Sequence, residues 1–130
     1  MTAKLDGVVV LVVEDDEDAL AAMRLFLERH GALVFPATDA AAAVAVLDRI
    51  KPSVLVSDIM MPVADGWWVV AEARRRGHLQ DVPRVAVTAL DLRPEDVSEG
   101  GFDAYLRKPV DPETLCATIH SLARGERRSA

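Results

Sequence analysis

Short hydrophobic runs alternate with longer, mixed segments along this chain. The runs are rich in valine and lie at residues 8–13, 32–35, 54–56, 85–87 and 104–106. Each run is too short for a helix, and the first and third do not alternate with polar residues. Such runs are typical of strands buried on both faces, as in a parallel sheet covered by helices. We therefore expect five strands at these positions.

The segments between the runs carry helical patterns. Residues 16–30 place four apolar side chains on one stripe, namely Leu20, Met23, Phe26 and Leu27, and Gly31 ends the pattern. A second helix is predicted over residues 40–50, with Asp39 as its N-cap and Pro52 beyond its end. The remaining helices are expected at residues 67–76, at residues 94–99 and from Pro112 onward.

Strands that alternate with helices predict an α/β protein with a doubly wound, five-stranded parallel sheet and helices on both faces. We expect a single domain over residues 1–130, with a core over about residues 7–124 and a polar tail at 125–130. The crossovers are expected to be right-handed, and the carboxyl ends of parallel strands meet at one edge, where such sheets bind their ligands.

Composition narrows the function classes. Hydrophobic residues make up 51% and charged residues 28%, a globular balance that excludes disorder of the whole chain. The net charge of −6 lacks the basic footprint of a nucleic-acid binder. The longest purely apolar run has eight residues, too few for a membrane span of about 18. The one cysteine, Cys116, forms no internal disulfide, so we expect a cytoplasmic protein.

Polar residues stand at the carboxyl ends of four predicted strands. In chain order they are Glu14, Asp15, Asp16, Asp58, Thr88 and Lys108. Taken singly, each has an ordinary structural explanation, such as a helix cap, a backbone hydrogen bond or a solvated charge. Taken together they are chemically matched, because the fold brings them to one edge of one sheet.

Clustered carboxylates at Glu14, Asp15 and Asp58 repel one another, and a divalent cation relieves that repulsion. A ligand set made of oxygen atoms favours Mg²⁺. Carboxylates and Mg²⁺ beside Lys108 and Thr88 are also the groups that phosphoryl transfer requires. A carboxylate can itself accept the phosphoryl group and form an aspartyl phosphate.

At these residues the chain resembles the receiver domain of two-component response regulators. The resemblance is carried by the segments 12–16, 57–62, 65–66, 87–89 and 108–109, and it covers about residues 7–124. It implies a CheY-like fold with strand order 2-1-3-4-5. It also implies a signalling phosphoacceptor that takes a phosphoryl group from a histidine kinase or a histidine phosphotransfer protein, rather than a turnover enzyme.

The same resemblance implies roles for individual residues. Asp58 is the implied phosphoacceptor. Asp15 is implied to bind Mg²⁺ directly, Glu14 through water, and Met60 through its backbone carbonyl. Thr88 and Lys108 are implied to contact the phosphoryl group, and Tyr105 to act with Thr88 as the switch aromatic. The Lys108–Pro109 peptide is implied to be cis.

Three alternatives stay open from the sequence. Instead of a stand-alone phosphoacceptor, the first alternative is a receiver segment of a hybrid sensor histidine kinase. The second is a Mg²⁺-dependent phosphatase with an aspartyl nucleophile, and the third is an inert pseudo-receiver. The second is disfavoured because such phosphatases place an acid two residues after the nucleophile, where Met60 stands. The third is disfavoured by the full acidic set and Lys108.

Two surfaces bear on the partners. The interval from Thr88 to Lys108 is short for a full fourth helix, so we expect a remodelled face there. Only one helix is expected after Lys108, so we expect the signal to leave through contact with a protein rather than DNA. Ala19 and Ala22 form a small apolar step beside the acidic residues, a candidate kinase contact.

Trp67 and Trp68 are adjacent on one predicted helix, so they cannot both face the core. Trp67 is the better core candidate.

Overall fold

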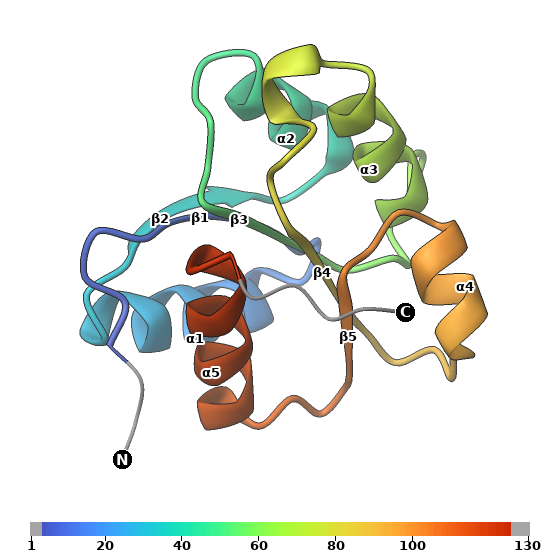
Figure 1. Ribbon diagram of the computed structural model, residues 1–130. Coiled ribbons are helices and arrows are strands. Elements are labelled where there is room, and N and C mark those ends of the chain that lie inside the picture. Colours follow the sequence, from blue (N-terminus) through green and yellow to red (C-terminus); the bar gives the residue numbers. More distant parts are fainter. Residues whose placement is uncertain (1–3, 126–130) are drawn as a thin grey trace.

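The computed structural model describes residues 4–125, which contain a five-stranded parallel sheet with helices on both faces (Figure 1). The strand order is β2-β1-β3-β4-β5. The predicted fold class and strand order are therefore confirmed. Beyond residue 125, the tail expected at the C-terminus lies outside the described residues.

The elements follow the alternation expected from the hydrophobic runs. The strands are β1 Val9–Val13, β2 Leu33–Ala37, β3 Val54–Ser57, β4 Arg84–Thr88 and β5 Ala104–Arg107. The helices are α1 Glu17–Arg29, α2 Ala40–Leu47, α3 Gly66–Arg74, α4 Pro94–Glu99 and α5 Pro112–Ala123. A 3₁₀ turn that the sequence did not predict, η1 Gly77–Leu79, follows α3.

The sheet separates two hydrophobic clusters. Helices α1 and α5 cover one face, and α2, α3 and α4 lie on the other (Figure 1). Val10 and Val12 of β1 belong to the first cluster, whereas Leu11 and Val13 belong to the second. All four are at most 1% exposed, so β1 is buried on both faces, as its unbroken apolar run predicts.

Three predicted boundaries differ from the structure by two or more residues, and one of them is the end of α3, which lies at Arg74 instead of residue 76. Strand β2 continues through Pro36 to Ala37, which is possible because β2 is an edge strand that pairs only with β1. Helix α2 ends at Leu47 instead of residue 50. Residues 48 and 49 form a turn after it, the N–H of Ile50 still bonds to the carbonyl of Val46 at 3.0 Å, and Pro52 prevents any further continuation.

The short fourth helix was predicted correctly. Helix α4 has six residues and begins at Pro94, where Asp96 accepts a hydrogen bond from the backbone N–H of Arg93. It ends at Glu99 with Gly100 as its C-cap, and Gly101 follows with a φ of +92°. The interval between β4 and β5 is therefore spanned by a single short helix and a tight glycine turn.

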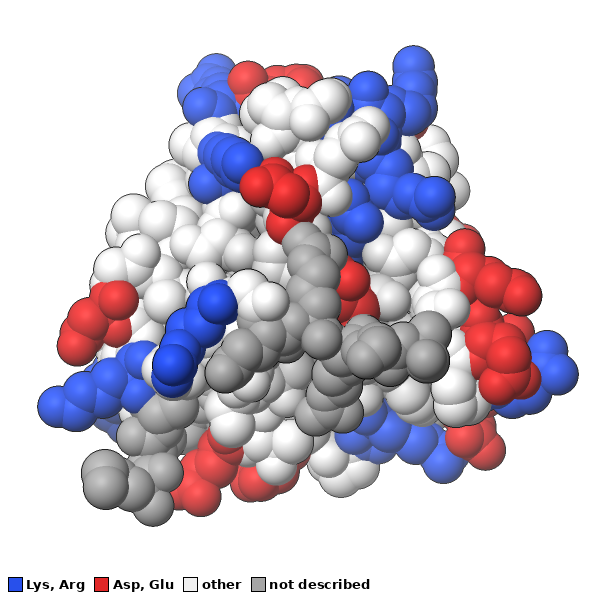
Figure 2. Space-filling view, in the orientation of Figure 1, with Lys and Arg blue, Asp and Glu red and all other residues white. Residues whose placement is uncertain are grey.

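Charged side chains of both signs are interspersed over the face drawn in Figure 2, with acidic groups gathered beside α4. Ion pairs between described residues include Arg76 with Asp48 at 2.7 Å and Lys51 with Asp81 at 2.9 Å, wherever they lie on the surface. This face carries no continuous basic surface among the residues described. Within residues 4–125, no helix is long and apolar enough to cross a membrane.

Candidate functional site

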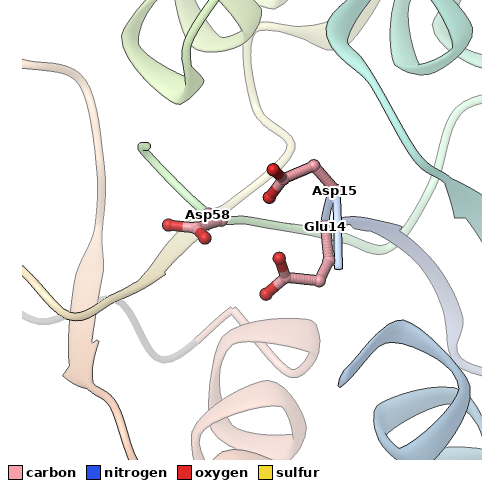
Figure 3. A group of neighbouring side chains, drawn as sticks. All are labelled: Glu14, Asp15 and Asp58. Carbon is pink, nitrogen blue, oxygen red and sulfur yellow. The ribbon is translucent and has the colours of Figure 1, made fainter. Parts of the chain in front are cut away.

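Three carboxylates meet where β1 and β3 end. The two strands pair in register, with Val13 beside Ser57, so the residues that follow them emerge at the same edge of the sheet. Glu14 and Asp15 follow β1, and Asp58 follows β3 (Figure 3). One oxygen from each carboxylate lies within 4.8 Å of the others. The sequence-based expectation that these side chains converge is therefore met.

The three acids differ in exposure. Glu14 is 1% exposed and Asp58 is 7% exposed, whereas Asp15 lies at the surface. Buried carboxylates are costly unless they are paired or hydrogen-bonded. The site therefore needs a cation close to Glu14 and Asp58.

Lys108 supplies that cation from the segment after β5. Its Nζ lies 2.5 Å from Oε1 of Glu14 and 2.9 Å from Oδ2 of Asp58. The Lys108–Pro109 peptide is cis, as the resemblance implied. The lysine side chain thus bridges the ends of β1 and β3 although it starts beyond the far edge strand.

The electrostatics of the pair follow from this geometry. Burial raises the pKa of Glu14, although the hydrogen bond from Lys108 lowers it in part. Burial alone depresses the pKa of Lys108, yet its hydrogen bonds to Glu14 and Asp58 raise that pKa above its ordinary value. The ammonium is therefore held in its charged form against the two acids.

Backbone groups fix the carboxylate of Asp58. Its Oδ1 accepts hydrogen bonds from the backbone N–H of Ile59 at 2.6 Å and of Met60 at 3.2 Å. Its own carbonyl accepts from the hydroxyl of Ser57 at 2.8 Å. Because Oδ1 is anchored in this way, Oδ2 is the oxygen turned toward Lys108.

The donor set suits Mg²⁺. Every candidate ligand atom is an oxygen, and Mg²⁺ takes oxygen ligands at 2.0–2.1 Å in an octahedron that keeps several waters. In such an octahedron neighbouring ligand oxygens lie about 3 Å apart and opposite ones about 4 Å apart. Oxygens of Glu14, Asp15 and Asp58 lie within 4.8 Å of one another, so the three carboxylates face one common space of the size that a single ion with its waters requires.

Thr88 lies on β4, which is next to β3, and Tyr105 lies on β5, the edge strand that pairs with β4. Thr88 is buried at the end of β4, and its Oγ1 accepts a hydrogen bond from the N–H of Leu90 at 3.3 Å. The hydroxyl of Tyr105 donates to the carbonyl of Leu90 and accepts from the N–H of Leu92 at 3.4 Å. Both side chains are therefore tied to the loop between β4 and α4.

The family follows from comparison with known proteins. The family model described as the response regulator receiver domain matches residues 10–120. This chain belongs to the response regulator receiver family. Receiver domains are signalling phosphoacceptors of two-component systems that partner with histidine kinases, and the acidic pocket of Glu14, Asp15 and Asp58 is consistent with such an acceptor site.

Individual relatives agree with this assignment. The chain is 41% identical over 113 residues to an uncharacterized 14.6 kDa protein of Leptolyngbya boryana, covering 85% of this chain and 86% of that protein. It is 31% identical over 118 residues to the protein PilH of Pseudomonas aeruginosa, covering 89% of this chain and 98% of PilH.

A solved structure bears on the metal. The receiver domain of the sensor histidine kinase PA1611 from Pseudomonas aeruginosa PAO1 superimposes with a TM-score of 0.83 and 27% identity, covering 91% of this chain and 98% of that one. That domain has a magnesium ion coordinated in its active-site cleft. The acidic cluster of the present receiver is similar to a magnesium site of this kind.

One residue of the site received no role from the sequence. Gly66, the first residue of α3, donates its N–H to the carbonyl of Ile59 at 2.9 Å. A Cβ on Gly66 would overlap the carbonyl oxygen of Asp58 and lie 2.8 Å from Cα of Ile59. The signal was present as the pair Asp65-Gly66 at the start of a helix, but its closeness to Asp58 follows only from the folded loop.

Proposed function

We propose that this receiver accepts a phosphoryl group on Asp58 from the phosphohistidine of a histidine kinase or a histidine phosphotransfer protein. A carboxylate oxygen of Asp58 bonds to phosphorus while the P–N bond of the phosphohistidine breaks. The electron pair of that bond stays on the imidazole nitrogen. The observation that carries the proposal is the contact of Lys108 with both Asp58 and Glu14 beside a third carboxylate.

Each candidate residue has a defined part in this proposal. Lys108 neutralises charge on the phosphoryl oxygens, and it stands 2.9 Å from the acceptor carboxylate. The hydroxyl of Thr88 donates to a second phosphoryl oxygen. Tyr105 responds through the loop that it shares with Thr88, because both side chains bond to Leu90.

Mg²⁺ is the proposed cofactor. Asp15 and Asp58 would hold it directly, Glu14 through a water molecule, and Met60 through its backbone carbonyl. When bound, the ion neutralises charge on the phosphoryl oxygens and orients them. The Mg²⁺ in the similar PA1611 receiver supports this assignment.

The test is direct labelling of the whole chain. With Mg²⁺ and acetyl phosphate as a small phosphodonor, intact mass spectrometry should detect the gain of one phosphoryl group. The gain should disappear in Asp58→Asn, which removes the acceptor oxygen, and in the presence of EDTA. Equal labelling of Asp58→Asn and the wild type would contradict the acceptor assignment.

The phosphatase alternative makes a different prediction. A phosphatase needs an acid to protonate the leaving group and a base to take the proton from the attacking water, and the thioether of Met60, two residues after Asp58, does neither. Met60 is 59% exposed. A chain that released phosphate from phosphate monoesters in many turnovers would favour the enzyme over the phosphoacceptor.

The proposed docking site of the phosphodonor is an apolar groove beside the acceptor. Its volume is about 540 Å³, and it runs between α1 and the segment that joins β5 to α5. Its lining residues include Ala19, Ala22, Phe26, Lys108 and Pro109. Because Lys108 belongs to both the groove and the acceptor site, a partner seated here would bring its histidine near Asp58.

A bulky charge should separate docking from chemistry. Ala22→Arg should slow transfer from the cognate kinase while labelling by acetyl phosphate continues at the wild-type rate. Loss of both activities, or of neither, would contradict this surface.

We propose in addition that residues 1–130 act as one domain, whose phosphorylation switches a surface for a downstream protein. The extent of the domain can be tested by limited proteolysis.

A further inference from the structure

The indole of Trp67 occupies the space where Gly100 has no side chain. A Cβ on Gly100 would overlap Cζ3 and Cε3 of that indole. The ring also makes an edge-to-face contact with Phe102, with centroids 5.5 Å apart and planes at 68°. Gly100 has a φ of −74°, which any residue adopts, so the indole rather than the backbone requires glycine at this position.

The residue before Trp67 touches the acceptor. Gly66 packs against the carbonyl of Asp58 and donates its N–H to Ile59. Consecutive residues in the first turn of α3 therefore contact the acceptor peptide on one side and the end of α4 on the other. A helix turn is rigid, so a displacement of Trp67 at Gly100 also displaces Gly66 at Asp58.

A second glycine strengthens the contact between α3 and the turn after α4. A Cβ on Gly101 would lie 2.7 Å from Cγ1 of Val70, which is one turn after Trp67 in α3. Two successive glycines thus let the turn lie flat against two successive turns of α3. Helix α4 has only six residues of its own, and this contact adds to the packing of Val97 in the core and to the contact of α4 with β5.

We infer that Trp67 is a positioning residue that couples the acceptor loop around Asp58 to helix α4. The inference rests on the proposed function, because phosphorylation of Asp58 is the event that Trp67 transmits. Coupling between two sites acts in both directions. A substitution at Gly100 must therefore alter the rate at which Asp58 is phosphorylated, although Gly100 lies at the end of α4 and contacts Trp67 rather than Asp58.

A substitution cycle tests the coupling. Gly100→Ala forces the indole from its seat, moves Gly66 with it and makes the acceptor loop less well ordered for reaction. We expect labelling by acetyl phosphate with Mg²⁺ to slow by at least about twofold, and by up to about 30-fold. Adding Trp67→Leu to Gly100→Ala makes room for the new methyl group and should restore most of the rate.

Gly77→Ala is the matched control, because a Cβ there meets no atom within 4 Å. It should label at the wild-type rate. A wild-type rate in Gly100→Ala, or a slow rate that Trp67→Leu does not restore, would overturn the coupling. A wild-type chain that gains no mass would overturn the proposed function itself, so the two failures are distinct.

Fluorescence gives a second test that leaves both glycines in place. The chain has two tryptophans, so Trp68→Phe leaves Trp67 as the only one. Labelling of Asp58 in this variant should shift the emission of Trp67, and Asp58→Asn should abolish both the labelling and the shift. Full labelling by mass with an unchanged emission spectrum would overturn the inference, whether or not Gly100→Ala folds.

Discussion

The acidic edge at β1 and β3 and the region around α4 are built by different means. At the acidic edge, Glu14 and Asp58 are held by the ammonium of Lys108. Around α4, Trp67 fills a space that Gly100 leaves open, and Tyr105 bonds to loop backbone. The acidic edge depends on charged side chains that attract each other, besides the backbone N–H groups on Oδ1 of Asp58, whereas the region around α4 depends on the space left by a glycine and on bonds to backbone groups.

The difference affects how each region tolerates change. A charged site can respond to a new ion or to pH, because its energy depends on which groups are ionised. The energy of a close-packed apolar contact does not depend on ionisation; it changes when the volume of a side chain in the contact changes. The two regions join at Gly66, which contacts Asp58 and directly precedes Trp67.

Gly66→Ala should have the largest effect on stability. The new methyl group would overlap the backbone of Asp58, which is fixed by the strand before it and has no flexible end to move aside. We expect the free energy of unfolding to fall by about 3 kcal/mol, as for other insertions into a packed interior. Urea unfolding followed by circular dichroism measures this loss.

Gly77→Ala serves again as the comparison, since its methyl group meets open space and its φ is negative. Its unfolding free energy should stay within about 1 kcal/mol of the wild type or rise slightly. If the two variants lose similar stability, the cost comes from glycine replacement in general rather than from contact with Asp58.

Lys108→Met should come next, because it leaves Glu14 buried without its cation. We expect a loss of about 2 kcal/mol at neutral pH in EDTA. Burial already raises the pKa of Glu14, and the variant raises it further. The penalty is therefore present above the folded pKa of Glu14 and disappears as pH falls below its unfolded value, where the acid is neutral in both states.

Lys51→Met provides the control for Lys108→Met. Lys51 pairs with Asp81 at 2.9 Å, but its side chain is 51% exposed, and such surface pairs contribute little. Its stability should change by less than about 1 kcal/mol at every pH. A loss in Lys108→Met that does not diminish toward acidic pH would argue against the burial of an ionised Glu14 as its cause.

The contrast between the regions also explains what could be predicted from the sequence. Glu14, Asp15, Asp58 and Lys108 were identified because their charges stand at strand ends, and the order of the strands followed from the resemblance. For a charged residue, the residue type alone identifies the chemical group that stands at the end of the strand. A parallel sheet then brings them together.

The role of Gly66 and the seat of Trp67 on Gly100 could not be predicted in this way. Glycine has no side chain to indicate a contact, and the sequence suggests only a turn at such positions. The partners are also distant in the chain, so the meeting of Trp67 with Gly100 depends on how α3 and α4 pack. Even the bonds of Tyr105 end on backbone groups of Leu90 and Leu92, which any residue carries.

Asp15→Ala should remove the response to Mg²⁺. If Mg²⁺ binds the folded acidic cluster, a concentration ten times its dissociation constant stabilises the wild type by about 1.4 kcal/mol, through mass action. The melting temperature of the wild type should therefore rise with Mg²⁺, and that of Asp15→Ala should rise much less. Differential scanning calorimetry at neutral pH gives both values.

Asp18→Ala removes the same charge from an exposed position in the first turn of α1. It should keep the full response to Mg²⁺, because Asp18 is not among the three converging carboxylates. An undiminished Mg²⁺ response in Asp15→Ala would place the ion elsewhere. An equal reduction in both variants would indicate general screening of negative charge rather than a defined site.

Tyr105→Phe should have the smallest effect and the most local one. It removes one hydroxyl, which donates to Leu90 and accepts from the N–H of Leu92, and it leaves the ring in place. The net loss for such a bond is about 1 kcal/mol. Hydrogen exchange at the amide of Leu92 should then be about fivefold faster, because the amide loses its acceptor. The amide of Ala42, capped by Asp39 at 2.7 Å on α2, should exchange at its original rate.

Unchanged exchange at Leu92 would mean that packing alone orders the loop between β4 and α4. Equal acceleration at both amides would mean that the variant loosens the whole domain, and the hydroxyl of Tyr105 would then have no special connection with that loop.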